Sequence, residues 1–236
     1  NFLKKILRKK IDYVLHQSAL GSVPRSLKDP INSNKNNVEA TLNLFFLSSK
    51  NKNIKKVVFA SSGSVYGDVK GNQKQENKIG IQLSPYGASK RITEIYADTF
   101  SKCYNLKYVS LRYFNVFGPH QRNNGPYPTV ISGWIKSAIK EKTLRVFGDG
   151  KQTRDFCYVE DVVNANITSA IDKKTINKTI NISGGKSISL NDLAKIFKKF
   201  FKNSRLRIVY FKKREGDILN SKANLSNAKK FLNYKP

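Results

Sequence analysis

The run Lys56-Val57-Val58-Phe59-Ala60, followed by the polar turn Ser61-Ser62-Gly63-Ser64, decides the fold class of this chain. A short apolar run that ends in a Ser/Gly cluster is typical of a strand buried on both faces of a parallel sheet. Such a strand places Ser62 at its carboxyl end, where open α/β sheets bind their ligands. The pattern therefore predicts a parallel α/β sheet with a binding site beside Ser62.

The segment Ser84-Pro85-Tyr86-Gly87-Ala88-Ser89-Lys90 predicts the start of a helix. A serine can cap the first turn, and proline suits the first helical position because it has no amide proton to leave unpaired. Tyr86 and Lys90 share one face of this helix because they stand four positions apart. An ammonium favours the phenolate, so we expect Lys90 to lower the pKa of Tyr86 and make it a base near neutral pH.

The rest of the chain alternates between helical and extended patterns. Helices are expected over 30–49, 92–104 as a continuation of the Tyr86 helix, and 134–142. Strands are expected over 11–16, 109–113 and 144–147. The chain should leave the sheet in the polar segment 118–125 and return around 156–170. These limits assign 1–118 and 152–172 to the sheet domain, and 119–151 and 173–236 to a smaller α/β lobe.

Length and composition favour a globular enzyme domain. The 236 residues, 39% of them hydrophobic, are enough to bury one substantial core and a small lobe. No apolar run approaches the length of a membrane span, and no signal-peptide pattern begins the sequence. Cys103 and Cys157 are the two cysteines, which favours a reducing compartment, so a cytoplasmic location is expected.

The net charge of +28 raises the alternative of a nucleic-acid-binding or membrane-binding protein. The lysines, however, occur in pairs scattered along the whole chain, and no zinc-finger spacing or stacking motif accompanies them. We interpret them as a solvated lysine-rich surface, with no specific nucleic-acid partner and no membrane partner. Weak, salt-sensitive binding to DNA fits either interpretation.

Four further motifs follow one another in a characteristic order: HQSALGSVPRS at 16–26, LRYFNVFGP at 111–119, TRDFCYVED at 153–161 and REGD at 214–217. With Ser62 and the Tyr86/Lys90 pair, they resemble the extended short-chain dehydrogenase/reductase superfamily, and within it the NAD-dependent epimerase/dehydratase family. The segment 16–26 is most similar to the subgroup that epimerises UDP-N-acetylhexosamines. The resemblance runs through nearly the whole chain and implies a Rossmann-type doubly wound parallel sheet with a smaller α/β substrate lobe.

The resemblance implies an NAD-dependent 4-epimerase of a UDP-sugar, UDP-GlcNAc/UDP-GalNAc, that works through a 4-keto intermediate. In that family Tyr86 would take the proton from the C4 hydroxyl and Lys90 would hold the nicotinamide ribose. Ser62 would donate a hydrogen bond to the oxygen that becomes the ketone. A small residue at Ser221 would leave room for an N-acetyl group. The resemblance also implies a role in polysaccharide biosynthesis and a homodimer that packs through 30–49 and 86–104.

The other site residues are also assigned by the resemblance. Cofactor contacts are implied for Ala19, Asn37, Ala60, Tyr86, Lys90 and Tyr113. Substrate contacts are implied for Gly21, Ser22, Ser62, Asn115, Gln121, Thr129, Val130, Arg154, Arg214, Asp217 and Ser221. Guanidinium groups suit a diphosphate because they make paired, charge-assisted bonds to phosphate oxygens. No metal site is predicted, since His16 and His120 are lone histidines.

Related reactions remain as alternatives. Dehydratases and decarboxylases of the superfamily carry a carboxylate in the turn where this chain has Ser62-Gly63-Ser64, because elimination needs a further acid or base. The missing carboxylate favours an epimerase, although Gly63 replaces a hydroxyl residue of the similar subgroup. A UDP-glucose 4-epimerase and a non-catalytic Rossmann binding protein also stay open.

One motif of dinucleotide-binding domains is missing from the sequence. The glycine-rich phosphate turn should follow the first strand, but the chain begins Asn1-Phe2-Leu3-Lys4-Lys5 and contains no methionine. We therefore expect the amino-terminal part of the Rossmann domain to be absent from this chain, and we expect the chain alone to bind NAD poorly.

Overall fold

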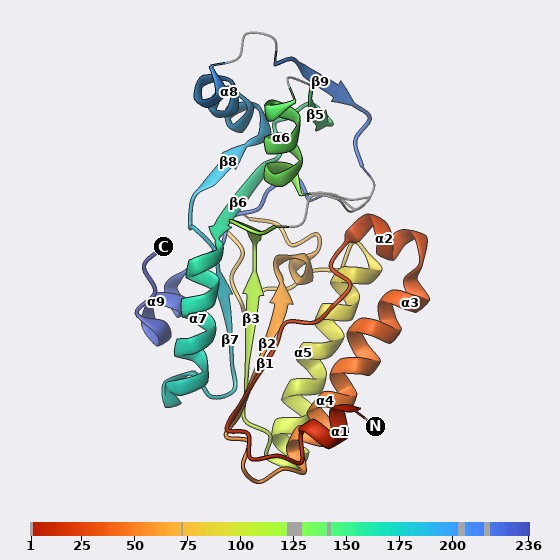
Figure 1. Ribbon diagram of the computed structural model, residues 1–236, viewed down its shortest axis with the longest axis vertical. Coiled ribbons are helices and arrows are strands. Elements are labelled where there is room, and N and C mark those ends of the chain that lie inside the picture. Colours follow the sequence, from red (N-terminus) through yellow and green to blue (C-terminus); the bar gives the residue numbers. More distant parts are fainter. Residues whose placement is uncertain (1, 72, 122–128, 141–142, 203–205, 215–217) are drawn as a thin grey trace.

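The computed structural model describes residues 2–71, 73–121, 129–140, 143–202, 206–214 and 218–236. The larger part is a parallel sheet with helices on both faces, and a smaller lobe lies beyond the carboxyl ends of its strands (Figure 1). Within the described ranges no helix combines the length and the apolar character that a membrane crossing requires.

The sheet confirms the predicted α/β fold. It contains β1 (Tyr13–His16), β2 (Lys56–Ser62), β3 (Tyr108–Tyr113) and β7 (Lys178–Ile182), all parallel and in the order β1-β2-β3-β7. Val57, Val58 and Phe59 are almost completely buried, as the apolar run predicts. The register pairs Ser62 with Tyr113, so these two side chains end neighbouring strands at the same edge.

Helices cover both faces of the sheet (Figure 1). On one face lie α2 (Val23–Lys28), α3 (Pro30–Asn34), α4 (Ala40–Ser49) and α5 (Pro85–Tyr104), with α1 (Phe2–Ile6) beside the lower end of α4. On the other face lie α7 (Val159–Ile171) and α9 (Ser226–Leu232). The helix predicted over 30–49 contains a π-helical turn at Lys35–Glu39, and such turns recur at functional sites because they reorient side chains.

The smaller lobe has its own core. Trp134 of α6 (Val130–Ile139) packs edge-on against Phe197 of α8 (Leu190–Phe201), beside the parallel pair β5 (Leu144–Phe147) and β9 (Ile208–Phe211). A three-stranded sheet of β4 (Asn115–Phe117), β6 (Thr153–Tyr158) and β8 (Ser187–Ser189) connects the lobe with the main sheet.

The structure changes the limits predicted for the two parts. β7 and α9 fall in 173–236, which the sequence assigned to the lobe, but β7 pairs with β3 and α9 packs beside it. The sequence analysis missed this strand because the polar Asn181 stands between Ile180 and Ile182. In the structure all three residues are buried, and Asn181 accepts a hydrogen bond from the hydroxyl of Tyr66. α6 also begins earlier than the helix predicted over 134–142, and half of the predicted loop 118–125, residues 122–125, lies outside the described residues.

Candidate active site

The serine turn and the tyrosine helix meet, as predicted. Ser84 caps α5 by accepting a hydrogen bond from the Gly87 amide at 3.1 Å. A side chain at Gly87 would place its Cβ 2.7 Å from the carbonyl oxygen of Ser64, so only glycine lets the helix approach the turn this closely. Burial raises the pKa of the Tyr86 phenol, and the hydroxyl of Ser62 opposes that rise.

Lys90 lies on the buried side of α5 and donates a hydrogen bond to the carbonyl oxygen of Ala60 at 2.8 Å. Burial lowers the pKa of its ammonium to about 8, and the charge of Glu94 opposes that fall. The expectation that Lys90 lowers the pKa of Tyr86 is wrong for this structure. The ammonium is directed to Ala60, burial leaves the pKa of Tyr86 above its ordinary value, and the opposing contact is Ser62.

A cavity of about 260 Å³ opens beside Ser62. Its lining includes six of the predicted residues: Ser62, Tyr113, Asn115, Arg154, Arg214 and Ser221. An adjoining cavity of about 790 Å³ shares both arginines and is lined by the predicted Thr129 and Val130 and by the rings of Phe117 and Phe147. Neither lining contains a carboxylate among the described residues, so the junction of the two cavities suits an anionic group.

The two arginines are held in place by neighbours in the lobe. Arg154 donates to the carbonyl oxygen of Ile218 at 2.7 Å, and the guanidinium of Arg214 lies 3.7 Å from the centre of the Phe147 ring. Stacking on an aromatic face stabilises a guanidinium group and fixes its orientation. Both guanidinium groups are thus positioned where the smaller lobe faces the carboxyl edge of the sheet.

Two other tyrosines have hydroxyl groups that are engaged by amide side chains. Burial raises the pKa of Tyr113 to about 12, and its hydroxyl accepts a hydrogen bond from Asn166 at 2.7 Å. Burial also raises the pKa of Tyr66 to about 12, and its hydroxyl donates to Asn181. Tyr86 differs from both because the group that opposes the effect of burial on its pKa is Ser62, which lines the cavity.

The profile of the NAD dependent epimerase/dehydratase family matches residues 1–183, and the serine, tyrosine and lysine described above fall within that match. The chain belongs to this family. Family members with solved structures include the UDP-N-acetylglucosamine 4-epimerase of Methanobrevibacter ruminantium, in complex with UDP-N-acetylmuramic acid. Its sequence is 42% identical to this chain. The two structures match with a TM-score of 0.93, and the match covers 100% of this chain and 74% of the epimerase chain.

Two more members of the family act on other sugars. The UDP-glucose 4-epimerase of Thermotoga maritima, solved with UDP-glucose, is 33% identical, with a TM-score of 0.94 over 100% of this chain and 75% of its own. The UDP-glucuronic acid 4-epimerase of Bacillus cereus, solved with UDP-glucuronic acid and NAD, is 33% identical, with a TM-score of 0.92 over 100% of this chain and 73% of its own.

NAD is the cofactor of this family, and the described residues fit its nicotinamide-ribose end. Among the described residues, Ala60 alone provides a hydrogen-bond acceptor for the Lys90 ammonium. An ammonium has three donors, so two remain for ribose hydroxyls. Lys90 and Tyr86 would hold that ribose, and the carboxyl edge of the sheet is where such folds bind dinucleotides.

The remaining predicted site residues have structural contacts, and their ligand contacts stay predictions. Ser22 caps α2 through the Arg25 amide, and Asn37 is buried, where it accepts from the Leu20 amide and donates to the hydroxyl of Ser89. Gln121 donates to the carbonyl oxygen of Val116. Ala19 and Gly21 lie in the link between β1 and α2, and Asp217 lies outside the described residues.

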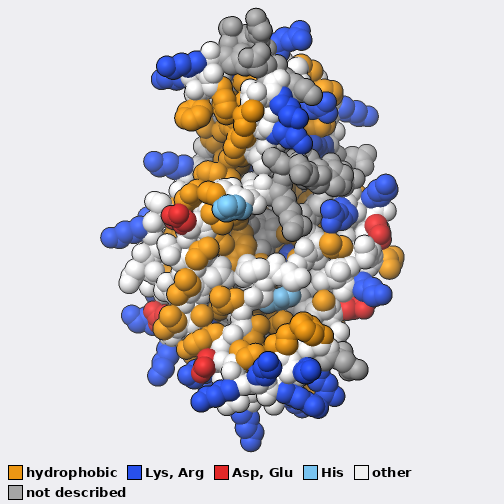
Figure 2. All heavy atoms as spheres, in the orientation of Figure 1, with side chains coloured by type: hydrophobic (Ala, Val, Ile, Leu, Met, Phe, Trp, Pro, Cys, Tyr) orange, Lys and Arg blue, Asp and Glu red, His pale blue; other side chains and the backbone are white. Residues whose placement is uncertain are grey.

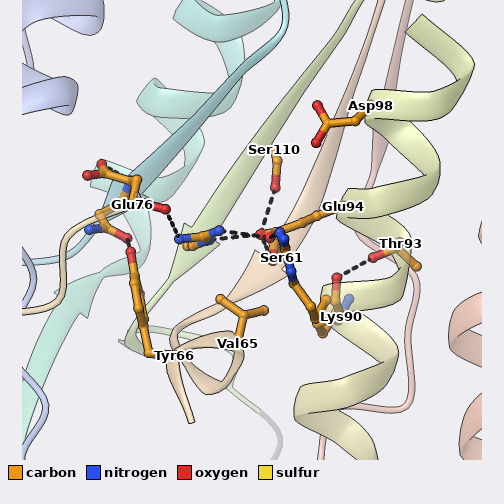
Figure 3. Close-up of polar contacts among 12 residues, drawn as sticks. Ser61, Val65, Tyr66, Glu76, Lys90, Thr93, Glu94, Asp98 and Ser110 are labelled. Atoms are coloured by element: carbon orange, nitrogen blue, oxygen red, sulfur yellow. Dashed lines mark hydrogen bonds and ion pairs between the residues drawn. The ribbon is translucent and has the colours of Figure 1, made fainter. Parts of the chain in front are cut away.

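One buried ion pair was missed by the sequence analysis. Glu94 of α5 accepts two hydrogen bonds from Arg112 of β3, each 2.8 Å long, and a third from Ser61 at 2.6 Å (Figure 3). The signal in the sequence was weak but present. Glu94 stands four positions after Lys90, on the same helical face, where an unpaired carboxylate would not be stable.

The half-buried histidine at the end of β1, His16, predicts how the stability of the fold depends on pH. Burial, with a smaller effect from the Lys90 charge, lowers the pKa of His16 to about 4. Between pH 6.5 and 4 the unfolded chain takes up a proton that the folded chain does not, so the free energy of unfolding should fall as the pH is lowered. We expect the melting temperature of His16→Gln to fall less steeply with decreasing pH than that of the unaltered protein. An equal dependence on pH in both proteins would contradict the assignment.

Proposed function

We propose that this chain carries the catalytic site of an NAD-dependent 4-epimerase of UDP-GlcNAc and UDP-GalNAc. The observation that carries the proposal is the close approach of the Tyr86 helix to the Ser62 turn, at a cavity that also presents two arginines. Phenol and serine are the groups needed to take a proton from a sugar hydroxyl and stabilise the resulting carbonyl. The arginines supply the charge that a sugar-nucleotide diphosphate requires.

Each residue has a distinct part in the proposed reaction. Tyr86 accepts the proton of the C4 hydroxyl, and Ser62 donates a hydrogen bond to the same oxygen as it becomes a ketone. Lys90 holds the nicotinamide ribose. When bound, NAD would supply a hydride acceptor for C4 and, once reduced, a hydride donor to the other face of the keto sugar, so no second substrate is needed.

The turn after β2 supports epimerisation over elimination. Ser62, Gly63 and Ser64 line the cavity, and none of them can supply a carboxyl group for the loss of water or of carbon dioxide. A Cβ added to Gly63 would lie 3.5 Å from the Phe114 ring, an ordinary contact distance. The hydroxyl residue of the similar subgroup would therefore fit at this position.

The proposal is tested by incubating purified protein with a large excess of NAD, because the chain alone is expected to bind the cofactor poorly, and with each of UDP-GlcNAc, UDP-GalNAc, UDP-glucose and UDP-glucuronic acid. Interconversion of the two N-acetylated sugars without added reductant is the expected result. Faster conversion of UDP-glucose or UDP-glucuronic acid would move the substrate assignment to another sugar. Net formation of a dehydrated or decarboxylated product would overturn the reaction class.

Ser221 supports the choice of an N-acetylated sugar. It lines the cavity with Ser62, and its main chain is fixed by Ser187, whose hydroxyl donates to its carbonyl oxygen, and by Thr153. A small side chain on a fixed backbone leaves space for an acetamido group in both orientations of the keto sugar. A large side chain there would fill a cavity of only about 260 Å³.

We therefore expect Ser221→Tyr to lower kcat/KM for UDP-GlcNAc about 100-fold or more while UDP-glucose turnover changes by less than about tenfold, since lost cavity volume penalises the larger substrate. Ser221→Ala is the matched control and should keep activity on both. The measurement is the pair of kcat/KM values for each variant. An equal loss on both sugars would show that this position does not select the substrate.

Assembly, location and pathway complete the proposal. We propose a homodimer through α4 and α5, because Phe46, Ile92, Ile95 and Tyr104 of these helices are exposed apolar side chains. Sedimentation at the mass of one chain would contradict this.

The free thiols of Cys103 and Cys157 support a reducing, cytoplasmic location. The sugar-nucleotide product would serve polysaccharide biosynthesis.

The high positive charge does not change the proposal. On the face shown in Figure 2, Lys and Arg side chains are spread from one end of the molecule to the other, with few acidic side chains between them. A nucleic-acid site would instead concentrate positive charge on one surface.

A further inference from the structure

Glu94 is a buried carboxylate with a complete set of partners. Its side chain is 2% exposed, and both of its oxygens accept hydrogen bonds from the guanidinium of Arg112, which is equally buried. Arg91 adds a bond of 3.2 Å to one oxygen. The Arg112 charge and these bonds hold the pKa of Glu94 below its ordinary value despite burial, so the group is a carboxylate at neutral pH.

This carboxylate connects the elements that carry the catalytic residues (Figure 3). The hydroxyl of Ser61 donates to Glu94 at 2.6 Å, and Ser61 directly precedes Ser62. Arg112 comes from β3, next to Tyr113. Glu94 thus joins α5 to both β2 and β3, immediately behind the edge where Ser62 and Tyr86 meet.

Glu94 also affects the pKa of the Lys90 ammonium. The groups that act on the ammonium are Glu94 on its own helix and His16 of β1, while Arg112 of β3 lies behind Glu94. His16 is uncharged at neutral pH because its pKa is about 4. Glu94 is therefore the negative charge that offsets the burial of Lys90.

We propose that Glu94 is a positioning residue of the active site: its carboxylate is the counter-charge that keeps Lys90 an ammonium, and it holds α5 against β2 behind Ser62. The importance of Glu94 for catalysis rests on the proposed function. Its effect on the charge of Lys90 is a property of the folded chain and does not depend on that function. Arg112 acts through Glu94, since it keeps the carboxylate ionised and fixed.

The test is a titration of Lys90 by NMR, in protein labelled with ¹³C at the lysine Cε atoms. Lys90→Met identifies the resonance, because one signal that titrates near pH 8 should disappear. Glu94→Gln keeps the size of the side chain and an acceptor for Ser61 but removes the charge. We expect the pKa of Lys90 to fall by about one unit or more, because the charge of Arg112 is then uncompensated.

Asp98→Asn is the matched control. Asp98 stands one turn further along α5, accepts a hydrogen bond from the hydroxyl of Tyr108, and lies apart from the cluster in Figure 3. This variant removes a carboxylate from the same helix and should leave the pKa of Lys90 unchanged. An unchanged pKa in Glu94→Gln, or an equal fall in both variants, would overturn the proposal.

A second variant covers the outcome in which Glu94→Gln does not fold. Glu94→Gln with Arg112→Met removes both buried charges and should fold more readily than the single variant. The pKa of Lys90 should still lie below that of the unaltered chain, and an equal value would overturn the proposal. The titration needs no substrate, so absence of epimerase activity would refute the proposed function and leave this result intact.

Discussion

Tyr86→Phe should abolish epimerisation while leaving the fold unchanged. The substitution removes one hydroxyl, the group that we propose accepts the C4 proton and whose pKa is affected by Ser62. General base catalysis contributes about 10²–10⁴-fold to enzymatic rates, so we expect kcat to fall by about 1,000-fold or more. The measurement is kcat for UDP-GlcNAc in the variant and in the unaltered protein.

Two controls accompany this prediction. The melting temperature of Tyr86→Phe should stay close to that of the unaltered protein, because the main-chain bond from the Tyr86 amide to the Ser26 hydroxyl remains. Tyr113→Phe removes a hydroxyl from the same cavity and should reduce kcat much less, because that hydroxyl is engaged by Asn166 and we propose no proton transfer for it. Epimerisation at the normal rate in Tyr86→Phe would refute the assignment of the base.

The largest effect on stability is expected for Arg112→Met. This change leaves Glu94 as a buried carboxylate without its bidentate partner. Loss of one member of a buried pair costs about 3–5 kcal/mol, since the remaining charge is neither hydrated nor neutralised. Urea unfolding of the variant should show a correspondingly lower midpoint.

The double variant Arg112→Met, Glu94→Gln distinguishes charge from packing. If the unpaired charge causes the loss, the double variant should be more stable than Arg112→Met alone, despite one more substitution. If the loss comes from contacts of the guanidinium, such as its stacking 4.9 Å from the centre of the Tyr66 ring, the second change should lower stability further. That second outcome would contradict the prediction.

Features set by nearby residues could be predicted from the sequence. The buried strand at Lys56–Ser62, the cap at Ser84 and the helix start at Pro85 depend on a few neighbouring side chains, and all three are confirmed. The placement of Ser62 beside Tyr86 follows from the same reasoning, because strand and helix are consecutive in the chain. The order of the motifs was sufficient to predict the family.

Features set by distant contacts could not be predicted. β7 was missed because the partner that allows Asn181 to be buried, Tyr66, is far away in the sequence. The pairing of Glu94 with Arg112 likewise depends on how α5 crosses β3. The error about the pKa of Tyr86 has the same origin, since spacing along a helix does not show how deeply a phenol is buried or where a neighbouring ammonium points.

The cavity beside Ser62 is lined by residues that belong to two separately packed cores. Ser62 and Tyr113 end strands of the main sheet, whereas Arg214 contacts Phe147 of the smaller lobe. A nucleotide that contacts both sets of residues would therefore hold the sheet and the lobe together for as long as it is bound. Ligand that binds only when both units are folded raises their stability together, by an amount that grows with the logarithm of its concentration. Saturation with UDP should thus merge the melting of the lobe and of the sheet into one transition.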